Sequence, residues 1–147
     1  MDLLPNETQT ELREAVERFI RDACRFETQR RAPDATGGDD RLWPRFVELG
    51  WLAIPFAEAD GGLGWGPREM GVVTEGLGLG LVTEPVTPTW LAGGLIAELG
   101  SPDQRAAWIG AVLAGEAKLA LAPKQMATRR DSWLIPVAIA SFIAIGK

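Results

Sequence analysis

The sequence predicts an all-α fold, an antiparallel helical bundle of about five helices followed by a short apolar C-terminal tail. Apolar residues recur at three- and four-residue spacing along most of the chain, which is the pattern of a helix with one buried face. Residues that favour helix starts and glycines that favour helix ends bracket these segments. The connections are short, which favours antiparallel neighbours in a bundle.

The first helix is predicted to start near Thr8, because Thr8 and Glu11 have the spacing of a capping box. Charged residues fill its outer face and indicate a solvated surface. Its apolar stripe consists of Leu12, Val16, Phe19, Ile20 and Cys24. We interpret Cys24 as a small core residue and not as a nucleophile.

Residues 32–40 are predicted to form a loop, since they combine proline, paired glycines and acidic residues. A second helix follows, with Asp40 as its cap, Pro44 in its first turn and Gly50 in a left-handed conformation at its end. Its predicted buried side consists of Leu42, Trp43, Phe46, Val47 and Leu49.

Four glycines in residues 61–66 predict a tight loop with positive φ angles. Only a five-residue apolar run precedes this loop, and no βαβ pattern follows it. A dinucleotide fingerprint needs both, so we interpret the loop as structural and not as a phosphate cradle.

The third helix is predicted to start at Pro67, which suits a first helical position. Its likeliest buried positions are Met70, Val73 and Leu77. Glycines at alternate positions follow, at Gly76, Gly78 and Gly80. They predict close packing against another helix.

The fourth helix is predicted over residues 89–99, with Thr87 as its cap and Pro88 at its start. Most of its faces are apolar, so we expect a central, buried helix. The fifth helix has Ser101 and Gln104 in a capping box and ends at Gly115. A short extended run over residues 119–123 follows it.

Composition excludes several functional classes. The net charge of −5 argues against a nucleic-acid surface, which needs an excess of Lys and Arg. The chain has no histidine, which removes the usual catalytic triads and most zinc sites, so no metal site is predicted. A single cysteine excludes an intramolecular disulfide, and the acidic N-terminal segment does not have the order of a secretory signal. We therefore expect a cytoplasmic protein.

Three blocks of the sequence together resemble the N-terminal helical domain of acyl-CoA dehydrogenases. The blocks read TQTELREAVERF, then LWPRFVELGWLAIPFAEADGGLG, then EGLGLGLVTEPVTPTWLAGGLIAELGSPDQRAAWIGAVLAGEAKLALA. The resemblance covers about residues 5–122. It implies a domain over residues 1–122 and a divergent tail over 123–147.

The resemblance implies an FAD-dependent flavoprotein that oxidises the Cα–Cβ bond of acyl-CoA thioesters. In the family a glutamate base and most flavin contacts belong to the middle and C-terminal domains. We therefore expect this chain to be inactive in isolation, without a catalytic residue of its own and without retained FAD. The alternative is a non-catalytic helical interaction module or a partner subunit.

The resemblance places the start of the fourth helix near the acyl chain. Thr87 and Trp90 are thus weak candidates for the wall of the acyl pocket, and the favoured interpretation is that Thr87 caps the helix and Trp90 packs in the core. Glu75 and Glu84 flank the same helix, but we interpret both as structural or surface acids. The face that covers the next domain in the family is expected to be apolar and open here, which predicts self-association.

The tail differs in character from the rest of the chain. Residues 1–115 carry a net charge of −8, whereas residues 116–147 carry +3. The family motif that begins the β domain is missing after residue 122, so the tail is either a divergent start of that domain or the product of truncation or frameshift. The apolar block 133–145 is too short for a secure membrane span. We expect it to pack on the bundle as a strand or helix, with membrane association as the less favoured alternative.

Overall fold

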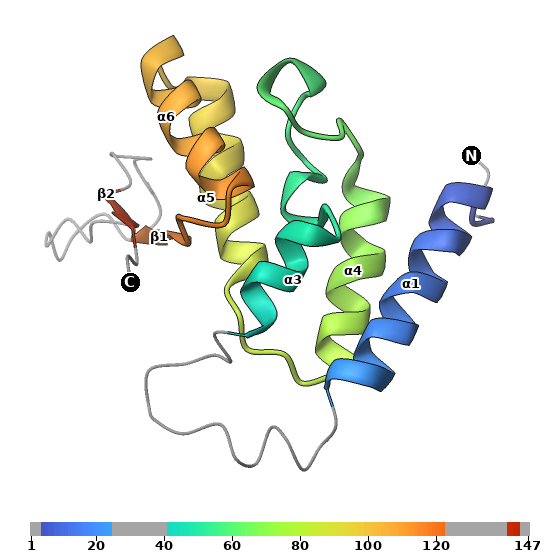
Figure 1. The fold of residues 1–147 in the computed structure, drawn as a ribbon. Coiled ribbons are helices and arrows are strands. Elements are labelled where there is room, and N and C mark those ends of the chain that lie inside the picture. Colours follow the sequence, from blue (N-terminus) through green and yellow to red (C-terminus); the bar gives the residue numbers. More distant parts are fainter. Residues whose placement is uncertain (1–3, 25–40, 123–140, 145–147) are drawn as a thin grey trace, which may run out of the picture.

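The computed structural model describes residues 4–24, 41–122 and 141–144 (Figure 1). Within these ranges the chain forms five α-helices, two 3₁₀ turns and a two-stranded antiparallel sheet, which confirms the predicted all-α class. The helices are α1 (Glu7–Ala23), α3 (Leu42–Glu48), α4 (Pro67–Leu79), α5 (Val86–Leu99) and α6 (Pro102–Leu113). The turns are η1 (Trp51–Ala53) and η2 (Glu58–Asp60), and the strands are β1 (Leu119–Ala122) and β2 (Ser141–Ala144). No helix in the described ranges is both long enough and apolar enough to span a membrane.

Helix α1 is capped by Asn6, so the predicted start at Thr8 is wrong. The Asn6 side chain accepts a hydrogen bond from the Gln9 N–H at 2.8 Å. In return the Gln9 side chain accepts one from the Asn6 N–H at 3.2 Å. This pair makes the same reciprocal capping box that Thr8 and Glu11 offered, but two residues earlier, and it extends the helix by about half a turn.

Helices α1 and α4 lie side by side and run in the same direction, unlike the antiparallel pair α5 and α6 (Figure 1). Two of the alternating glycines make the close contact possible. A Cβ on Gly76 would collide with Val16, and one on Gly80 would lie 2.7 Å from Ile20 Cδ1. Gly78, by contrast, faces open space. The prediction of close helix packing is therefore confirmed, and Gly76 and Gly80 are the residues responsible.

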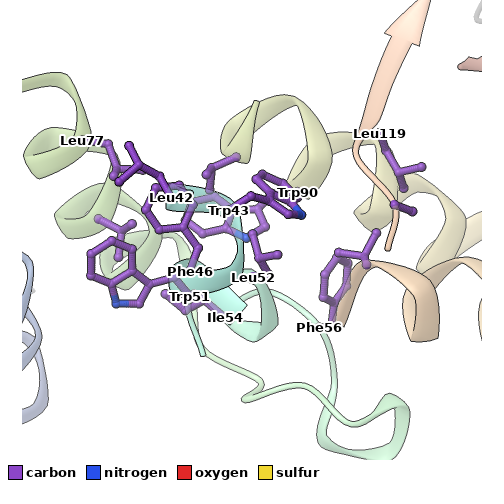
Figure 2. Packing of buried hydrophobic residues seen from close by; sticks show 14 of the residues in the cluster. Leu42, Trp43, Phe46, Trp51, Leu52, Ile54, Phe56, Leu77, Trp90 and Leu119 are labelled. Carbon is purple, nitrogen blue, oxygen red and sulfur yellow. The ribbon is translucent and has the colours of Figure 1, made fainter. Parts of the chain in front are cut away.

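Aromatic rings from three elements form the centre of the core. The ring of Phe19 on α1 lies 5.6 Å from that of Phe46 on α3 and 5.0 Å from that of Trp51 on η1. Phe19 belongs to the same cluster as Leu52 and Trp90, and Figure 2 shows Phe46 and Trp51 packed with these two residues. Edge and tilted ring contacts of this kind add to the stability gained by burial alone.

The second predicted helix is largely confirmed as α3, with differences at both ends. Arg41 occupies the N-cap without a side-chain hydrogen bond, and the expected cap Asp40 lies outside the described residues. Val47 is half-buried and packs against the core, whereas Leu49 is exposed, so the expectation of a buried Leu49 is wrong. The chain turns at Gly50, whose φ of 71° is left-handed as predicted, and this turn directs the apolar run that follows into the core.

Helix α5 begins at Val86 with Pro85 at its N-cap, so the predicted cap Thr87 is instead the second helical residue. Pro88 is accommodated because amides in the first helical turn have no partner within the helix. The capping box of α6 is confirmed, since Ser101 accepts from the Gln104 N–H at 3.2 Å and Gln104 accepts from the Ser101 N–H at 2.9 Å.

The predicted extended run after α6 is strand β1. It pairs with β2 in a register that sets Leu119 opposite Ala144 and Ala122 opposite Ser141. Residues 141–144 of the apolar block are thus a strand, as expected for part of it. Residues 133–140 and 145 lie outside the described residues.

Candidate functional site

Helix α5 is covered on one face, so the expectation of a central, buried helix is confirmed for its inner face and wrong for its outer face. Its inner face includes Trp90, Ala92, Gly93 and Ile96, all buried. Its outer face carries three leucines at four-residue spacing: Leu91, Leu95 and Leu99. Their exposed fractions are 54%, 36% and 77%. We call these three residues the outer leucine stripe.

Three leucines one turn apart make a continuous apolar strip along about 12 Å of the helix. Scattered exposed leucines are ordinary on a protein surface, whereas a contiguous strip marks a place where a ligand or another protein surface packs. The stripe was overlooked at the level of sequence because a helix that is apolar on most faces also fits complete burial. The spacing of four residues between these leucines places them on one face of the helix, and this is the sequence signal that separates the outer face from the inner one.

The two candidate residues Thr87 and Trp90 are neighbours on α5 in different environments. Thr87 is exposed at the first turn and makes no capping hydrogen bond. Trp90 is only 1% exposed and lies in the core cluster (Figure 2). Its buried indole N–H has no hydrogen-bond acceptor among the described residues. A ligand on the outer face could therefore touch Thr87 directly, whereas Trp90 supports the helix from behind.

Strand β1 is held to the inner side of α5 by one hydroxyl group. Thr89 is completely buried, and its Oγ1 accepts a hydrogen bond from the Leu119 N–H at 3.1 Å. The same hydroxyl donates to the Leu119 carbonyl oxygen at 3.3 Å. This contact has no local sequence signal, because it joins residues 30 positions apart.

The glycine-rich loop is shaped as a tight turn but offers no cradle for a phosphate. Gly61 and Gly64 have the predicted positive φ angles, 85° and 63°, whereas Gly62 and Gly66 do not. Each backbone N–H from residue 61 to residue 66 already donates to an acceptor within the loop region. A phosphate or pyrophosphate would need those amides free. The loop is therefore structural, and the described residues do not by themselves form a flavin pyrophosphate site.

The two acidic residues interpreted above as structural or surface acids, Glu75 and Glu84, lie in such positions. Glu75 makes an exposed ion pair with Arg13 at 2.8 Å. Glu84 is buried at the entrance to α5. No group of three or more potential metal-ligating side chains occurs in the part of the chain that the structure describes.

Two shallow grooves lie away from the outer leucine stripe. One, of about 360 Å³, borders α6 and contains the ion pair between Arg105 and Asp60 at 2.7 Å. The other, of about 320 Å³, lies between α1 and α3 and is lined by Phe19, Leu49 and charged side chains. Arg105 in the first groove is already paired, and neither groove brings a candidate acid and a candidate nucleophile together.

Comparison with known proteins gives a consistent family match. Residues 6–116 match the family described as acyl-CoA dehydrogenase, N-terminal domain. Over 124 residues the chain is 30% identical to "Acyl-CoA dehydrogenase FadE27" of Mycobacterium tuberculosis (strain ATCC 25618 / H37Rv). This alignment covers 83% of the chain but 33% of FadE27, so the chain spans about a third of the length of that relative.

Two solved structures contain the same arrangement of helices. The ChsE4-ChsE5 complex from Mycobacterium tuberculosis aligns with a TM-score of 0.77 and 27% identity, over 87% of this chain and 36% of the matched chain. A variant of the Tcur3481-Tcur3483 steroid ACAD aligns with a TM-score of 0.72 and 28% identity, over 80% of this chain and 32% of the other. In both cases the similarity is confined to about a third of the matched chain.

Proposed function

This chain belongs to the acyl-CoA dehydrogenase family, and we propose that it supplies the N-terminal helical wall of an FAD-dependent enzyme that oxidises the Cα–Cβ bond of acyl-CoA thioesters. The outer leucine stripe of α5 is the observation that carries this proposal. It is apolar, continuous and uncovered within the described residues, as a surface that receives an acyl chain must be.

The role proposed for each residue follows from its exposure. Leu91 and Leu95 would contact the acyl chain along the helix, and Thr87 would contact it at the helix start. Trp90 would not touch the ligand. It would hold the wall in position through its burial behind α5.

The remaining parts of the proposed enzyme lie outside this domain. We place the end of the helical domain at residue 122, where β1 ends, and assign the catalytic base and the flavin contacts to further domains. When bound, FAD would accept the electrons removed from the acyl group. The chain alone is expected to be inactive and to purify without flavin. We propose the cytoplasm as its compartment, on the basis of its single cysteine.

A chimera tests the proposal. This chain would replace the matched N-terminal third of FadE27, and parent and chimera would be produced identically, so that any subunit required by the parent is available to both. We expect the chimera to contain flavin and to lose its flavin absorbance under anaerobic conditions on addition of an acyl-CoA that bleaches the parent. Replacing Leu91 and Leu95 by Asn in the chimera should raise the acyl-CoA concentration for half-bleaching about tenfold, without changing the flavin content.

The alternative function is that of a non-catalytic module or partner subunit, which would bind another protein through the outer leucine stripe. It is favoured by both solved structures, since one pairs ChsE4 with ChsE5 and the other pairs Tcur3481 with Tcur3483. If the chimera binds flavin but ignores acyl-CoA while the parent responds, the enzyme proposal fails. Light scattering of the unfused chain separates the two further: association that disappears in the Leu91→Asn, Leu95→Asn variant supports the module.

A further inference from the structure

Thr89 bonds differently from Thr10 and Thr74, whose hydroxyl groups donate to backbone carbonyl oxygens three or four residues earlier in the chain. Thr74 on α4 donates its hydroxyl to carbonyl oxygens of its own helix, Met70 at 3.0 Å and Gly71 at 3.1 Å, which is the usual solution for a threonine inside a helix. Thr89 turns its hydroxyl away from α5 and towards β1. There it meets both polar backbone groups of a single residue, Leu119.

The orientation of Leu119 within its strand follows from these bonds. Each strand residue in an antiparallel pair directs its N–H and C=O to the same side, and the side alternates from one residue to the next. Because both groups of Leu119 face Thr89, they point away from β2, although Leu119 is opposite Ala144 in the register. Ala120 and Ala122 are then the residues of β1 that bond to β2. Thr89 thus lies at the edge of β1 where a further strand would otherwise form hydrogen bonds.

Because the contact between Thr89 and Leu119 is buried, its loss is expected to destabilise the local structure. Both Thr89 and Leu119 are 0% exposed, so water cannot replace the hydroxyl if it is removed. A buried peptide group that loses both partners destabilises its local structure far more than an exposed one does. The place where β1 leaves the bundle is therefore controlled by one side chain on α5.

We propose that Thr89 is a positioning residue that fixes strand β1 relative to the outer leucine stripe of the same helix. The inner side of α5 bonds to the strand, while its outer side forms the wall proposed above. Thr89 thereby sets the geometry between that wall and the chain that continues from β1. The functional meaning of this geometry rests on the proposed function, whereas the positioning itself is measurable in the 147-residue chain.

Amide hydrogen exchange followed residue by residue tests the proposal in the full chain. Thr89→Val keeps the shape of the side chain but removes the hydroxyl. We expect it to lower the protection of the Leu119 amide about ten- to hundredfold and to weaken that of Ala120 and Ala122, with the α1 and α4 amides unchanged. Thr89→Ser restores the hydroxyl and should recover the protection of Leu119. The matched control Thr74→Val, whose lost hydrogen bonds lie within its own helix, should leave the β1 amides unchanged.

Three results would overturn the proposal: wild-type protection of Leu119 in Thr89→Val, equal loss of protection throughout the bundle, or no recovery in Thr89→Ser. If Thr89→Val does not fold, the wild-type chain still decides. Its Leu119 amide should then exchange as slowly as the α5 amides and more slowly than that of Leu121, which faces the same edge without a threonine. Faster exchange at Leu119 would disprove the contact. None of these measurements depends on flavin or acyl-CoA, so their outcome is independent of the proposed enzyme activity.

Discussion

The two halves of the bundle differ in the hydrogen bonds that join their elements and in the side chains on their outer surfaces. In the α1–α4 half, polar side chains join the starts of two helices: Gln9 donates to Glu69 at 2.7 Å, and Glu69 also accepts from the Gly66 N–H at 3.0 Å. Its outer surface is mostly charged, although Leu79 at the end of α4 is 77% exposed. In the α5–β1 half, the only described hydrogen bonds between the two elements come from Thr89, and the outer surface carries the exposed leucines.

This difference indicates which half is complete. The α1–α4 half satisfies its helix starts internally and presents mainly charged side chains to water, with Leu79 as a single exposed leucine at the end of α4, whereas three exposed leucines lie in a row on α5. The α5–β1 half leaves apolar surface uncovered within the described residues, and it is the half in which we place the ligand or partner. Substitutions that act on one half only test this difference between the two halves.

The largest loss of stability is expected from substitution of Trp90, which packs on the inner side of α5. Trp90→Ala should lower the free energy of unfolding by about 3–5 kcal/mol, because it leaves a large cavity in the core. Trp90→Phe should lower it much less, since the indole N–H has no acceptor to lose among the described residues. Urea denaturation followed by circular dichroism measures both variants. Equal losses for the two would show that the indole N–H contributes more than the geometry indicates.

An intermediate effect is expected at the α1–α4 contact. Gly76→Ala should destabilise the chain by about 1–3 kcal/mol, because the new methyl group collides with Val16, a buried β-branched residue with little room to move. Gly78→Ala is the matched control on the same helix. It meets nothing within 4 Å and should stabilise the chain by up to about 1 kcal/mol through helix propensity. Thermal unfolding of the pair should show shifts of opposite sign, and shifts of the same sign would contradict the packing.

The smallest effect is expected from pH at Glu69. The hydrogen bond from Gln9, followed by backbone bonds including that from Gly66, holds the pKa of the Glu69 carboxyl below its ordinary value of 4.5. A lowered pKa in the folded state means that the ionised carboxylate stabilises the fold at neutral pH. This contribution is lost as the pH falls below 4.5 and passes through the lowered pKa.

Glu69→Gln should therefore lower the melting temperature slightly at pH 7, by the equivalent of less than about 1 kcal/mol, because solvent screens this half-buried group. The difference from wild type should shrink on acidification, because the wild-type carboxyl then becomes neutral too. If the difference in melting temperature grew towards acid pH, the ionised Glu69 carboxylate would not stabilise the fold, and this prediction would be wrong. Glu75→Gln, which removes the exposed partner of Arg13, is the control for a surface charge outside the capping network.

Much of the fold could be predicted from local signals. The capping box of α6, the start of α4 at Pro67 and the left-handed Gly50 each depend on residues within a few positions of one another. The helix stripes around Val16 and Val73 were also recognisable, since burial on one helix face follows from periodicity. Errors arose where two neighbouring residues offered similar chemistry, as with Asn6 and Thr8.

The sequence by itself therefore determined the all-α class, the helix segments and the family, because short-range patterns of apolar, capping and turn residues specify helices. The tertiary structure decided which face of α5 is covered, which of three similar glycines lies against Val16, and that Thr89 reaches Leu119. Each of these depends on which surfaces meet in space. A single sequence contains no periodic signal for a contact between residues 30 positions apart, and only the packing of helices around one core makes that choice.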